Sequence, residues 1–337
     1  MKIRAFAATL ALGLTTVSAF AADMKVKPMA PAPPPSPWDF AFGSAAMSDY
    51  NFRGITQSNH KPSVSAYFEP RYNLSDTLQL YGGVSGESIS FPNRAAAEID
   101  WYGGLRPTFG KLALDFGFWY YWYPGGQCFN ALATIPGVSQ DCVANGNLPI
   151  NGNVVKADES FWEVYAKATY TLNDQWSYGG SVWYSPNVVN SGADGTFLTG
   201  NVKYTFPGTF WPQFPGGVGA YISADLGHWW IGTSDAFYCT LNAAGTGCGG
   251  QFPGGVPYGG YTTWDVGGGF TWKKFTLDLR WYDTDYSKGN CNSFTEAHTA
   301  SLGTAFTPIN PLGQTTNWCG SAFVAKFSVD LTLADLK

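Results

Sequence analysis

The residues able to do chemistry give little support for catalysis. The chain has three His, and a hydrolase of the Ser–His–Asp kind would need a nucleophile beside one of them. His228 lies beside two Trp residues in a strand-like segment, whereas His60 and His298 lie in loop-like segments. The sequence pattern places no nucleophile next to any of them. The Gly run at residues 267–269 lacks the strand-to-helix context of a phosphate-binding loop. We therefore predict that the protein is not an enzyme and holds neither a metal nor a cofactor.

The cysteines point to disulfide bonds. An even number of Cys in an exported chain is typical of disulfides, whereas a zinc site needs Cys and His at closer, mixed spacing. Each long loop that contains Cys contains a pair, and pairing within a loop needs only local closure. The predicted pairs are Cys128 with Cys142, Cys239 with Cys248, and Cys291 with Cys319.

Charged residues within the strand-like segments keep to one side of an alternating pattern. In residues 97–109, Glu98, Asp100 and Arg106 share one parity, and Trp101 has the other. Successive strand residues point to opposite faces, so one face of nearly every strand is free of charge. A charge that faces lipid at the bilayer midplane costs about 2–4 kcal/mol, which fits a lipid-facing apolar side. A soluble β-sandwich would show the same parity with the charges outside, so parity alone leaves both folds open.

Twelve segments with period-two alternation must position these residues. The predicted strands cover residues 38–50, 63–74, 78–91, 97–109, 112–123, 160–172, 176–185, 196–206, 218–230, 262–272, 275–283 and 321–331. Tight turns between them alternate with long links, except that 207–217 is long for a turn and 92–96 is short for a loop. Short turns at one end and long loops at the other are typical of outer-membrane barrels.

Composition supports the same fold. The chain is 17% aromatic and only 13% charged, with 41 Gly, and no segment after the N-terminus approaches the ~20 continuous apolar residues of a membrane helix. Aromatic residues near strand ends fit the two interfacial girdles of such barrels. The predicted girdle contains Trp101, Phe109, Trp119, Trp122, Trp176, Trp183, Trp229, Trp230, Trp264 and Trp272. We predict an all-β, transmembrane, antiparallel up-and-down β-barrel of about 12 strands.

The N-terminus predicts export. Lys2 and Arg4 precede an apolar run at residues 5–17, and a small-residue cleavage pattern ends at Ala21. We therefore predict a signal peptide at residues 1–21, a Pro-rich periplasmic tether at 22–37 and the barrel at 38–337. A disordered tail without a task is the alternative interpretation of the Pro-rich stretch.

The inward parity contains more Asp and Glu than Lys and Arg, which favours cations or neutral solutes if the lumen is open. Alternatively, these charges pair with one another as internal struts. The pore-lining candidates are Glu69, Arg71, Glu87, Glu98, Asp100, Arg106, Asp115, Glu163, Lys167, Lys203, Asp225, Asp265, Asp278, Arg280 and Lys326. Arg53, in the first long loop, is a candidate constriction charge, although bonding to turn carbonyls is the favoured interpretation of its side chain.

Several motifs resemble one family. "SDYNFRGITQS" at residues 48–58, "DFGFWYYWYPGG" at 115–126 and "EVYAKATY" at 163–170 are similar to the TorF-type putative porin family of proteobacteria. "YSPN" at 184–187 and "LDLRWYDTDY" at 277–286 fit as well. The resemblance implies an outer-membrane barrel with a pore function. Family members often finish near "SKSF", whereas this chain runs past Leu331 to Lys337, which puts the position of its insertion signal in doubt.

These features predict a porin-like channel in the outer membrane of a Gram-negative bacterium, with passive diffusion of small solutes or ions. The implied partners are outer-membrane lipid and the barrel-insertion machinery, and the oligomeric state stays open. The net charge of -5 argues against nucleic acid. A structural or adhesive barrel with disulfide-tied surface loops and no open pore is the alternative function.

Overall fold

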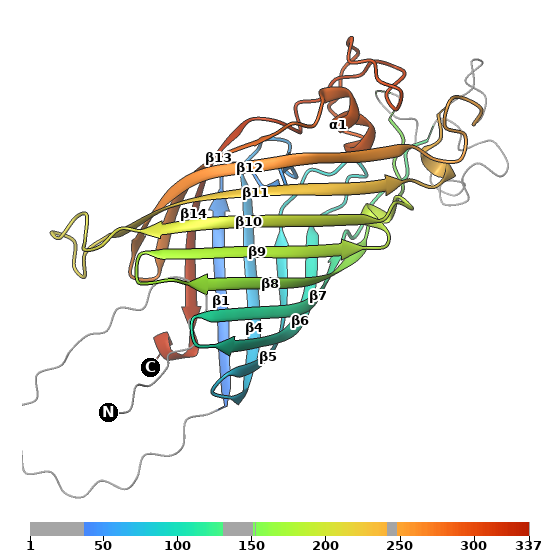
Figure 1. Ribbon diagram of the computed structural model, residues 1–337. Helices are drawn as coiled ribbons and strands as arrows, with labels where there is room; N and C mark the ends of the chain where they lie inside the picture. The colour runs from blue at the N-terminus through green and yellow to red at the C-terminus, as the bar shows by residue number, and fades with distance from the viewer. Residues whose placement is uncertain (1–36, 131–150, 152, 241–247, 337) are drawn as a thin grey trace, which may run out of the picture.

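The chain folds into one closed barrel. The computed structural model describes residues 37–130, 151, 153–240 and 248–336. Within them, twelve antiparallel strands form a closed sheet in which the first strand pairs with the last (Figure 1). These strands are β1 (Trp38–Met47), β4 (Ser63–Ser75), β5 (Leu78–Glu87), β6 (Glu98–Phe109), β7 (Leu112–Trp122), β8 (Phe161–Thr171), β9 (Trp176–Ser185), β10 (Gly195–Thr205), β11 (Gly219–Thr233), β12 (Pro257–Trp272), β13 (Phe275–Thr284) and β14 (Ala322–Thr332). The predicted all-β antiparallel barrel and its strand number are confirmed.

Tight turns gather at one end of the barrel. Phe109 pairs with Leu112 across a two-residue turn, and Trp272 pairs with Phe275 in the same way. The first turn residue has a positive φ in both cases (60° at Gly110 in the first turn), as hairpins joined by two residues prefer. We call this the turn end, and the opposite end, where the long links lie, the loop end. Residues 206–218 form the long exception at the turn end, as the sequence predicts.

Short helices decorate both ends. At the loop end lie η1 (Val188–Asn190), η2 (Ala236–Tyr238), α1 (Lys288–Thr295) and a small hairpin of β2 (Asn51–Phe52) with β3 (Ile55–Thr56). The helix η3 (Leu333–Leu336) follows the last strand at the turn end (Figure 1). In the described part of the chain, no helix is long and apolar enough to cross a membrane.

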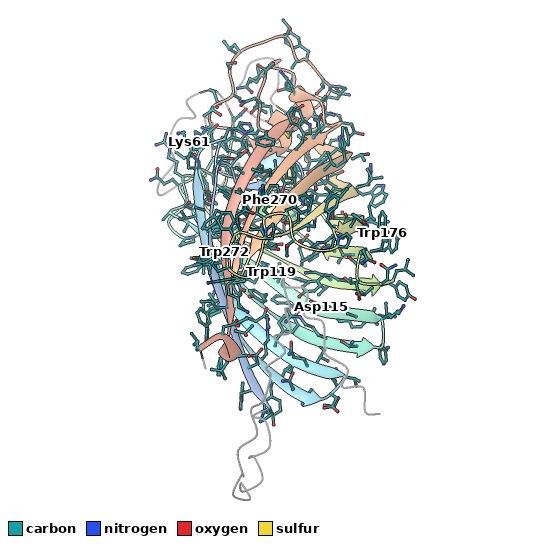
Figure 2. The ribbon with its side chains drawn as sticks, turned by 90° about the vertical axis from the view of Figure 1, so that its left-hand side faces the viewer. Lys61, Asp115, Trp119, Trp176, Phe270 and Trp272 are labelled. Carbon is teal, nitrogen blue, oxygen red and sulfur yellow. A yellow bond between two sulfur atoms is a disulfide. The ribbon has the colours of Figure 1, made fainter. Side chains whose placement is uncertain are left out.

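The outer face of the barrel is apolar. On β6, Trp101 and Phe109 point outward and are 53% and 63% exposed. Asp100, directly before Trp101, points inward and is 3% exposed. Trp176 projects from the outer surface in the same way (Figure 2). Such a continuous exposed apolar surface is stable only in contact with lipid. The charged residues of the strands therefore face the lumen, on the side away from lipid.

We expect a charge on the outer face to destabilise the barrel. Leu226 on β11 is 61% exposed and faces outward. Leu226→Arg should lower the free energy of unfolding by about 2–4 kcal/mol, because the charge would lie in hydrocarbon. Urea unfolding in lipid vesicles measures the effect. The control is Leu302→Arg, at a loop residue 84% exposed, which should change stability little. Equal effects of the two substitutions would contradict the lipid-facing assignment.

Three predicted girdle residues face inward instead. Trp229 is 2% exposed, whereas its neighbour Trp230 is 51% exposed. Trp119 stacks on the inward ring of Tyr102, with 4.1 Å between centroids, and Trp183 packs against the inward-facing Tyr165. The prediction was wrong for Trp119, Trp183 and Trp229 because proximity to a strand end was counted without the parity of each residue.

Inward-facing tyrosines lie flat against glycines of the neighbouring strand. A Cβ built on Gly117 would come within 2.5 Å of the Tyr165 hydroxyl, and one built on Gly269 within 2.5 Å of the Tyr221 ring. Because only glycine leaves this space, each ring can rest on the wall and stay away from the barrel axis.

Candidate functional site

Two arginine-centred networks fill the inner wall toward the turn end. In the first, the Arg106 Nη1 atom of β6 donates to Glu69 Oε1 of β4 at 2.7 Å, and the Arg106 Nε atom donates to Asp115 Oδ2 of β7 at 3.3 Å. Arg71 also donates to Glu69, at 2.5 Å. The Tyr81 hydroxyl donates to Asp115. Neighbouring strands thus bring opposite charges together on the inner side.

The second network lies across β11, β12 and β13. Arg280 Nη1 donates to Asp265 Oδ1 at 2.5 Å and lies 3.8 Å from Asp225 Oδ2. Arg280 Nε donates to Asp278 Oδ1 at 3.1 Å. One guanidinium therefore holds three carboxylates together and offsets part of their charge, so the internal-strut interpretation describes much of the inward set.

Two inward lysines contact aromatic rings, whereas the inward arginines contact carboxylates. Lys167 Nζ lies 4.3 Å and 4.5 Å from the ring centroids of Tyr165 and Trp183, and Lys203 Nζ lies 4.0 Å from the Tyr221 ring. Among the described residues, neither lysine forms an ion pair within 4.0 Å. Their charges are held mainly by aromatic faces, a geometry that attracts cations.

A polar cavity of about 330 Å³ lies in the lumen toward the turn end. Its lining comes from walls that are far apart in the strand order, including β4 and β11. Lining residues that carry charge or a hydroxyl include Tyr67, Tyr221, Asp278, Arg280, Lys326 and Asp330. This space could hold a small polar solute.

The first long loop folds into the loop end of the lumen. We call residues 48–62 the plug segment. Its β2–β3 hairpin turns at Arg53 and Gly54, whose φ angles are 51° and 80°, a combination suited to a two-residue turn. The Tyr261 hydroxyl of β12 donates to the Arg53 carbonyl at 2.9 Å. On the other side, Phe52 packs edge-on against Tyr121 of β7. The plug segment therefore contacts both sides of the barrel.

Arg53 anchors the plug segment by its side chain. Its Nη1 and Nη2 atoms donate to the two Glu163 carboxylate oxygens at 2.9 Å and 2.7 Å. The guanidinium also lies 4.5 Å from the Phe197 ring and 4.4 Å from the Trp229 ring. Burial lowers the pKa of Arg53, but the Glu163 carboxylate outweighs this and raises it, so Arg53 stays charged. The favoured interpretation of the Arg53 side chain, bonding to turn carbonyls, was wrong.

Buried aromatic residues complete this closure. The plug residues Phe52 and Ile55 pack with Trp229, Tyr261 and other rings into one cluster at the loop end. Strand β3 of the hairpin also contacts the loop that precedes β14, because the Thr56 amide donates to the Trp318 carbonyl at 2.9 Å. The plug segment therefore fills much of the loop end of the lumen.

Three carboxylates remain beside the plug segment. Glu87 ends β5, and Glu98 and Asp100 begin β6, with Glu87 and Glu98 paired in register. The plug residue Tyr50 donates its hydroxyl to Glu98 Oε1 at 2.6 Å. Burial and the nearby Glu98 carboxylate raise the pKa of Tyr50 well above its usual range, so it stays a donor. Sequence parity placed these acids inward, but it could not show that they meet.

Disulfides tie the loops above the barrel. Cys239 pairs with Cys248 and Cys291 with Cys319, with Cα atoms 5.6 Å and 6.1 Å apart. Both predicted pairs are confirmed. For the pair Cys128–Cys142, Cys142 lies outside the described residues, so that bond stays a prediction.

We expect loss of the Cys291–Cys319 bond to loosen the loops at the loop end and not the barrel. Cys319 forms a backbone bridge with Ile55 of the plug segment. The double variant Cys291→Ser, Cys319→Ser should therefore be cleaved faster by protease in its loops. Its faster gel mobility before heating, which reports the folded barrel, should not change. The variant Cys239→Ser, Cys248→Ser is the control for the bond that does not touch the plug segment. Loss of the folded-barrel band would contradict this prediction.

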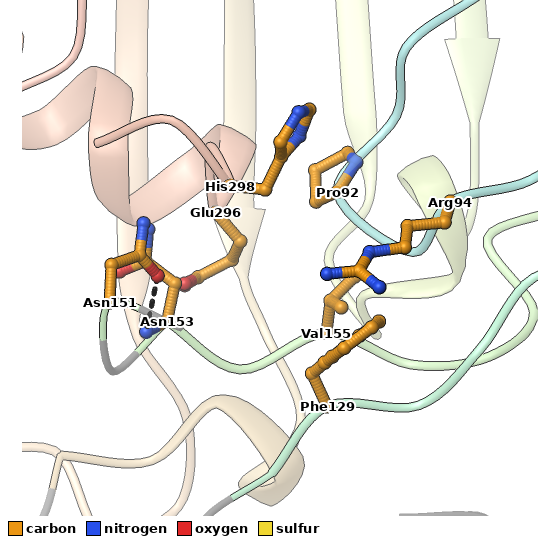
Figure 3. A pocket seen from close by; sticks show the side chains of 8 residues that line it. All are labelled: Pro92, Arg94, Phe129, Asn151, Asn153, Val155, Glu296 and His298. Carbon is orange, nitrogen blue, oxygen red and sulfur yellow. Dashed lines mark hydrogen bonds between the residues drawn. The ribbon is translucent and has the colours of Figure 1, made fainter. Parts of the chain in front are cut away.

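A second, much smaller cavity lies among the loops. Its volume is about 20 Å³, room for one water molecule, and Arg94, Glu296 and His298 face it (Figure 3). Burial raises the pKa of Glu296 well above its usual range, while the Val154 amide donates to its carboxyl. Burial and the positive charge of Arg94 lower the pKa of His298. The cavity is too small for a substrate.

Comparisons with known proteins give a partial family match and several similar structures. A model of Gcw_chp, a bacterial protein family of unknown function, matches residues 31–138, about a third of the chain. No curated protein sequence matches. An outer-membrane channel from Pseudomonas putida F1 is 13% identical, with a TM-score of 0.40 over 92% of this chain and 100% of its own. The NanC porin is 6% identical, with a TM-score of 0.39 over 88% and 98% of the two chains.

LpxR from Salmonella typhimurium is a further similar structure. It is 8% identical to this chain, with a TM-score of 0.38 over 86% of this chain and 99% of its own. At such identities the likeness is one of fold alone.

A histidine latch holds the outer part of the plug segment. His60 Nδ1 lies 2.8 Å from Asp49 Oδ2, and His60 Nε2 lies 2.8 Å from the Asn317 carbonyl. Both ring nitrogens face acceptors, so both must donate, which only the protonated ring can do. The bond to Asp49 raises the pKa of His60, opposed by burial. Burial raises the pKa of Asp49, but the bonds from His60, Thr56 and Ser58 outweigh it and lower the pKa.

We expect the latch to weaken in mild alkali. The stabilisation from His60 is complete below about pH 6.5, its unfolded pKa, and is lost as the pH rises through the raised folded pKa. The stabilisation from Asp49 is lost only as the pH falls through its lowered folded pKa. Hydrogen exchange of residues 48–62, corrected for the intrinsic rate, should be faster at about pH 8.5 than at about pH 5.5. His60→Gln should remove the difference, and the outward-facing control His228→Gln should keep it. Equal exchange at both pH values in the wild type would contradict the latch.

Proposed function

We propose that this protein is an outer-membrane channel for passive diffusion of small polar solutes or ions, closed by its plug segment in the structure described here. The observation that carries the proposal is the combination of a lipid-facing outer surface with a charged lumen that contains a cavity of about 330 Å³. Filling the whole lumen with apolar side chains would stabilise a purely structural barrel better than a polar cavity does.

The proposal includes the cellular setting. Residues 1–21 direct export and are removed, residues 22–37 lie in the periplasm, and the loop end faces the exterior. Lipid surrounds the barrel after the insertion machinery of the outer membrane has placed it there. The motif "SDYNFRGITQS" at residues 48–58 supports membership of the TorF-type putative porin family. That motif forms the greater part of the plug segment, so the segment that carries the resemblance is also the one that closes the lumen.

Selectivity in this proposal is a modest preference for cations. Six inward carboxylates lie within 3.8 Å of an Arg nitrogen and are compensated only in part, since three of them share Arg280: Glu69, Asp115, Glu163, Asp225, Asp265 and Asp278. The preference therefore depends on the excess carboxylates around Arg280 and on Glu87, Glu98 and Asp100, and it shrinks above about 0.1 M salt, where the Debye length is about 10 Å.

Conductance in planar bilayers tests the function. The wild type should show rare or small openings, and a salt gradient should give a reversal potential on the cation side. The second candidate function is a structural or adhesive barrel, favoured by the buried aromatic cluster and the disulfides above it. A barrel that inserts but never conducts, even without its plug segment, would support that second function. No catalytic role is part of the proposal.

A further inference from the structure

The three carboxylates beside the plug segment form a compact cluster on the inner wall. We call Glu87, Glu98 and Asp100 the acid cluster. One oxygen from each residue lies within 4.8 Å of the others. Glu98 and Asp100 are 2% and 3% exposed, so water reaches little of the cluster. Three ionisable groups of one sign are therefore held together, two of them buried and Glu87 partly exposed.

In the part of the chain that the structure describes, the acid cluster forms no ion pair. Among the described residues, no Lys, Arg or His nitrogen lies within 4.0 Å of its carboxylate oxygens. The lumen networks around Arg106 and Arg280 differ in this respect, since each centres on a guanidinium. The acid cluster is thus the one group of lumen carboxylates in the described chain that gathers without a counter-charge.

A separate observation shows unused ligand atoms. Asp100 Oδ1 and Glu87 Oε2 are buried and accept no hydrogen bond, whereas Asp100 Oδ2 accepts from Ser85 at 3.1 Å and the Trp119 side chain lies near the Asp100 carboxylate. Buried polar atoms in folded proteins nearly always have a partner. A buried oxygen that accepts no hydrogen bond, and lies next to two further carboxylates, is placed to bind a cation.

The geometry points to a site for a divalent metal ion of the Ca²⁺ class in the acid cluster. Ca²⁺ binds six to eight oxygen ligands, tolerates irregular geometry and accepts carboxylates in one- or two-oxygen contact. Three carboxylates supply the charge, and water can supply the remaining ligands. Softer metals prefer Cys or His, which the cluster does not contain.

The ion would connect the wall of the barrel to the plug segment. Glu98 Oε1 accepts from Tyr50 of the plug segment, and Glu98 Oε2 accepts from Tyr123 at 2.8 Å. Each carboxylate oxygen has a second lone pair, so Glu98 can hold both tyrosines and bind the ion. Bound Ca²⁺ fixes Glu98 as the charged acceptor for Tyr50 and so stabilises the seated plug segment.

Terbium luminescence tests the site without reference to conduction. The whole barrel, refolded in detergent free of lipopolysaccharide, should bind one Tb³⁺ per chain, with emission excited through nearby aromatic rings and suppressed by added Ca²⁺. Asp100→Asn should weaken the binding about tenfold or more, since ligand charge sets affinity in such sites. Asp225→Asn, which removes a lumen carboxylate outside the acid cluster, should leave it unchanged.

Two results would overturn the proposal. Absence of saturable Tb³⁺ binding by the folded wild type would mean that protonation alone reduces the repulsion among the three carboxylates. This measurement does not depend on whether a variant folds. Binding that survives both Asp100→Asn and Glu87→Gln places the ion elsewhere. Because both readouts concern metal binding, their outcome is separate from whether the barrel conducts.

Discussion

Deletion of the plug hairpin, residues 51–56, should turn a rarely conducting barrel into an open pore. The hairpin carries Arg53 and the aromatic ring of Phe52, which fill the loop end between opposite walls. Without them, the cavity of about 330 Å³ would communicate with the loop end. Planar-bilayer recordings should change from rare openings to a steady conductance that is several times larger. The barrel should stay folded, because no barrel-strand pairing involves the deleted residues.

The point variant Arg53→Ala separates anchoring from blocking. It leaves Glu163, which is 0% exposed, without its partner. Removing one partner of a buried ion pair typically costs about 3–5 kcal/mol. The urea concentration at the unfolding midpoint should therefore fall, and the plug segment should be held less firmly in the lumen. The double variant Arg53→Met, Glu163→Gln removes both charges and should recover most of the stability. A folded deletion variant that passes no current would refute the channel and leave the structural function.

The second large effect is expected from Arg280→Met. This side chain is 12% exposed and lies within 3.8 Å of carboxylate oxygens on three residues, Asp225, Asp265 and Asp278. Its loss leaves them mutually repelling, and their partial exposure limits the cost to about 3 kcal/mol. The lumen also becomes more negative by one charge, so its preference for cations should rise.

Reversal potentials measured in the plug-deleted background give the selectivity, and urea unfolding gives the stability. Asp225→Asn is the matched control: it removes the most distant of the three carboxylates and should shift selectivity in the opposite direction with little loss of stability. The difference between the two variants should shrink as salt rises above about 0.1 M. An unchanged reversal potential in Arg280→Met would show that these residues do not line the conducting path.

Most of the barrel could be predicted because its determinants are local. The period-two alternation in β6 gives the face of each residue, and a charge near mid-bilayer is costly enough to keep one face clear. The predicted strand at 176–185 has the bounds of β9, and the others differ by a few residues. Differences are largest at the loop end, where β12 extends to Pro257 and β1 ends at Met47 because tertiary contacts there decide where pairing stops.

The closure of the lumen could not be predicted in this way. Arg53 and Glu163 are 110 positions apart, and no local pattern links a loop residue to the strand that receives it. The acid cluster posed a related difficulty. Glu98 and Asp100 share a parity in the sequence, but the approach of Glu87 depends on the register of β5 with β6, which no local pattern specifies. Long-range partners of this kind follow from the closed sheet as a whole.

The glycines under the inward tyrosines determine the bore of the barrel. Tyr165 and Tyr221 can lie against the wall because Gly117 and Gly269 leave them a flat seat. An alanine in place of either glycine would push the tyrosine ring toward the barrel axis. The free cross-section of the lumen would fall, with no change in charge. The calibre of the lumen and its electrostatic field are therefore encoded by different residues, and each can vary without the other.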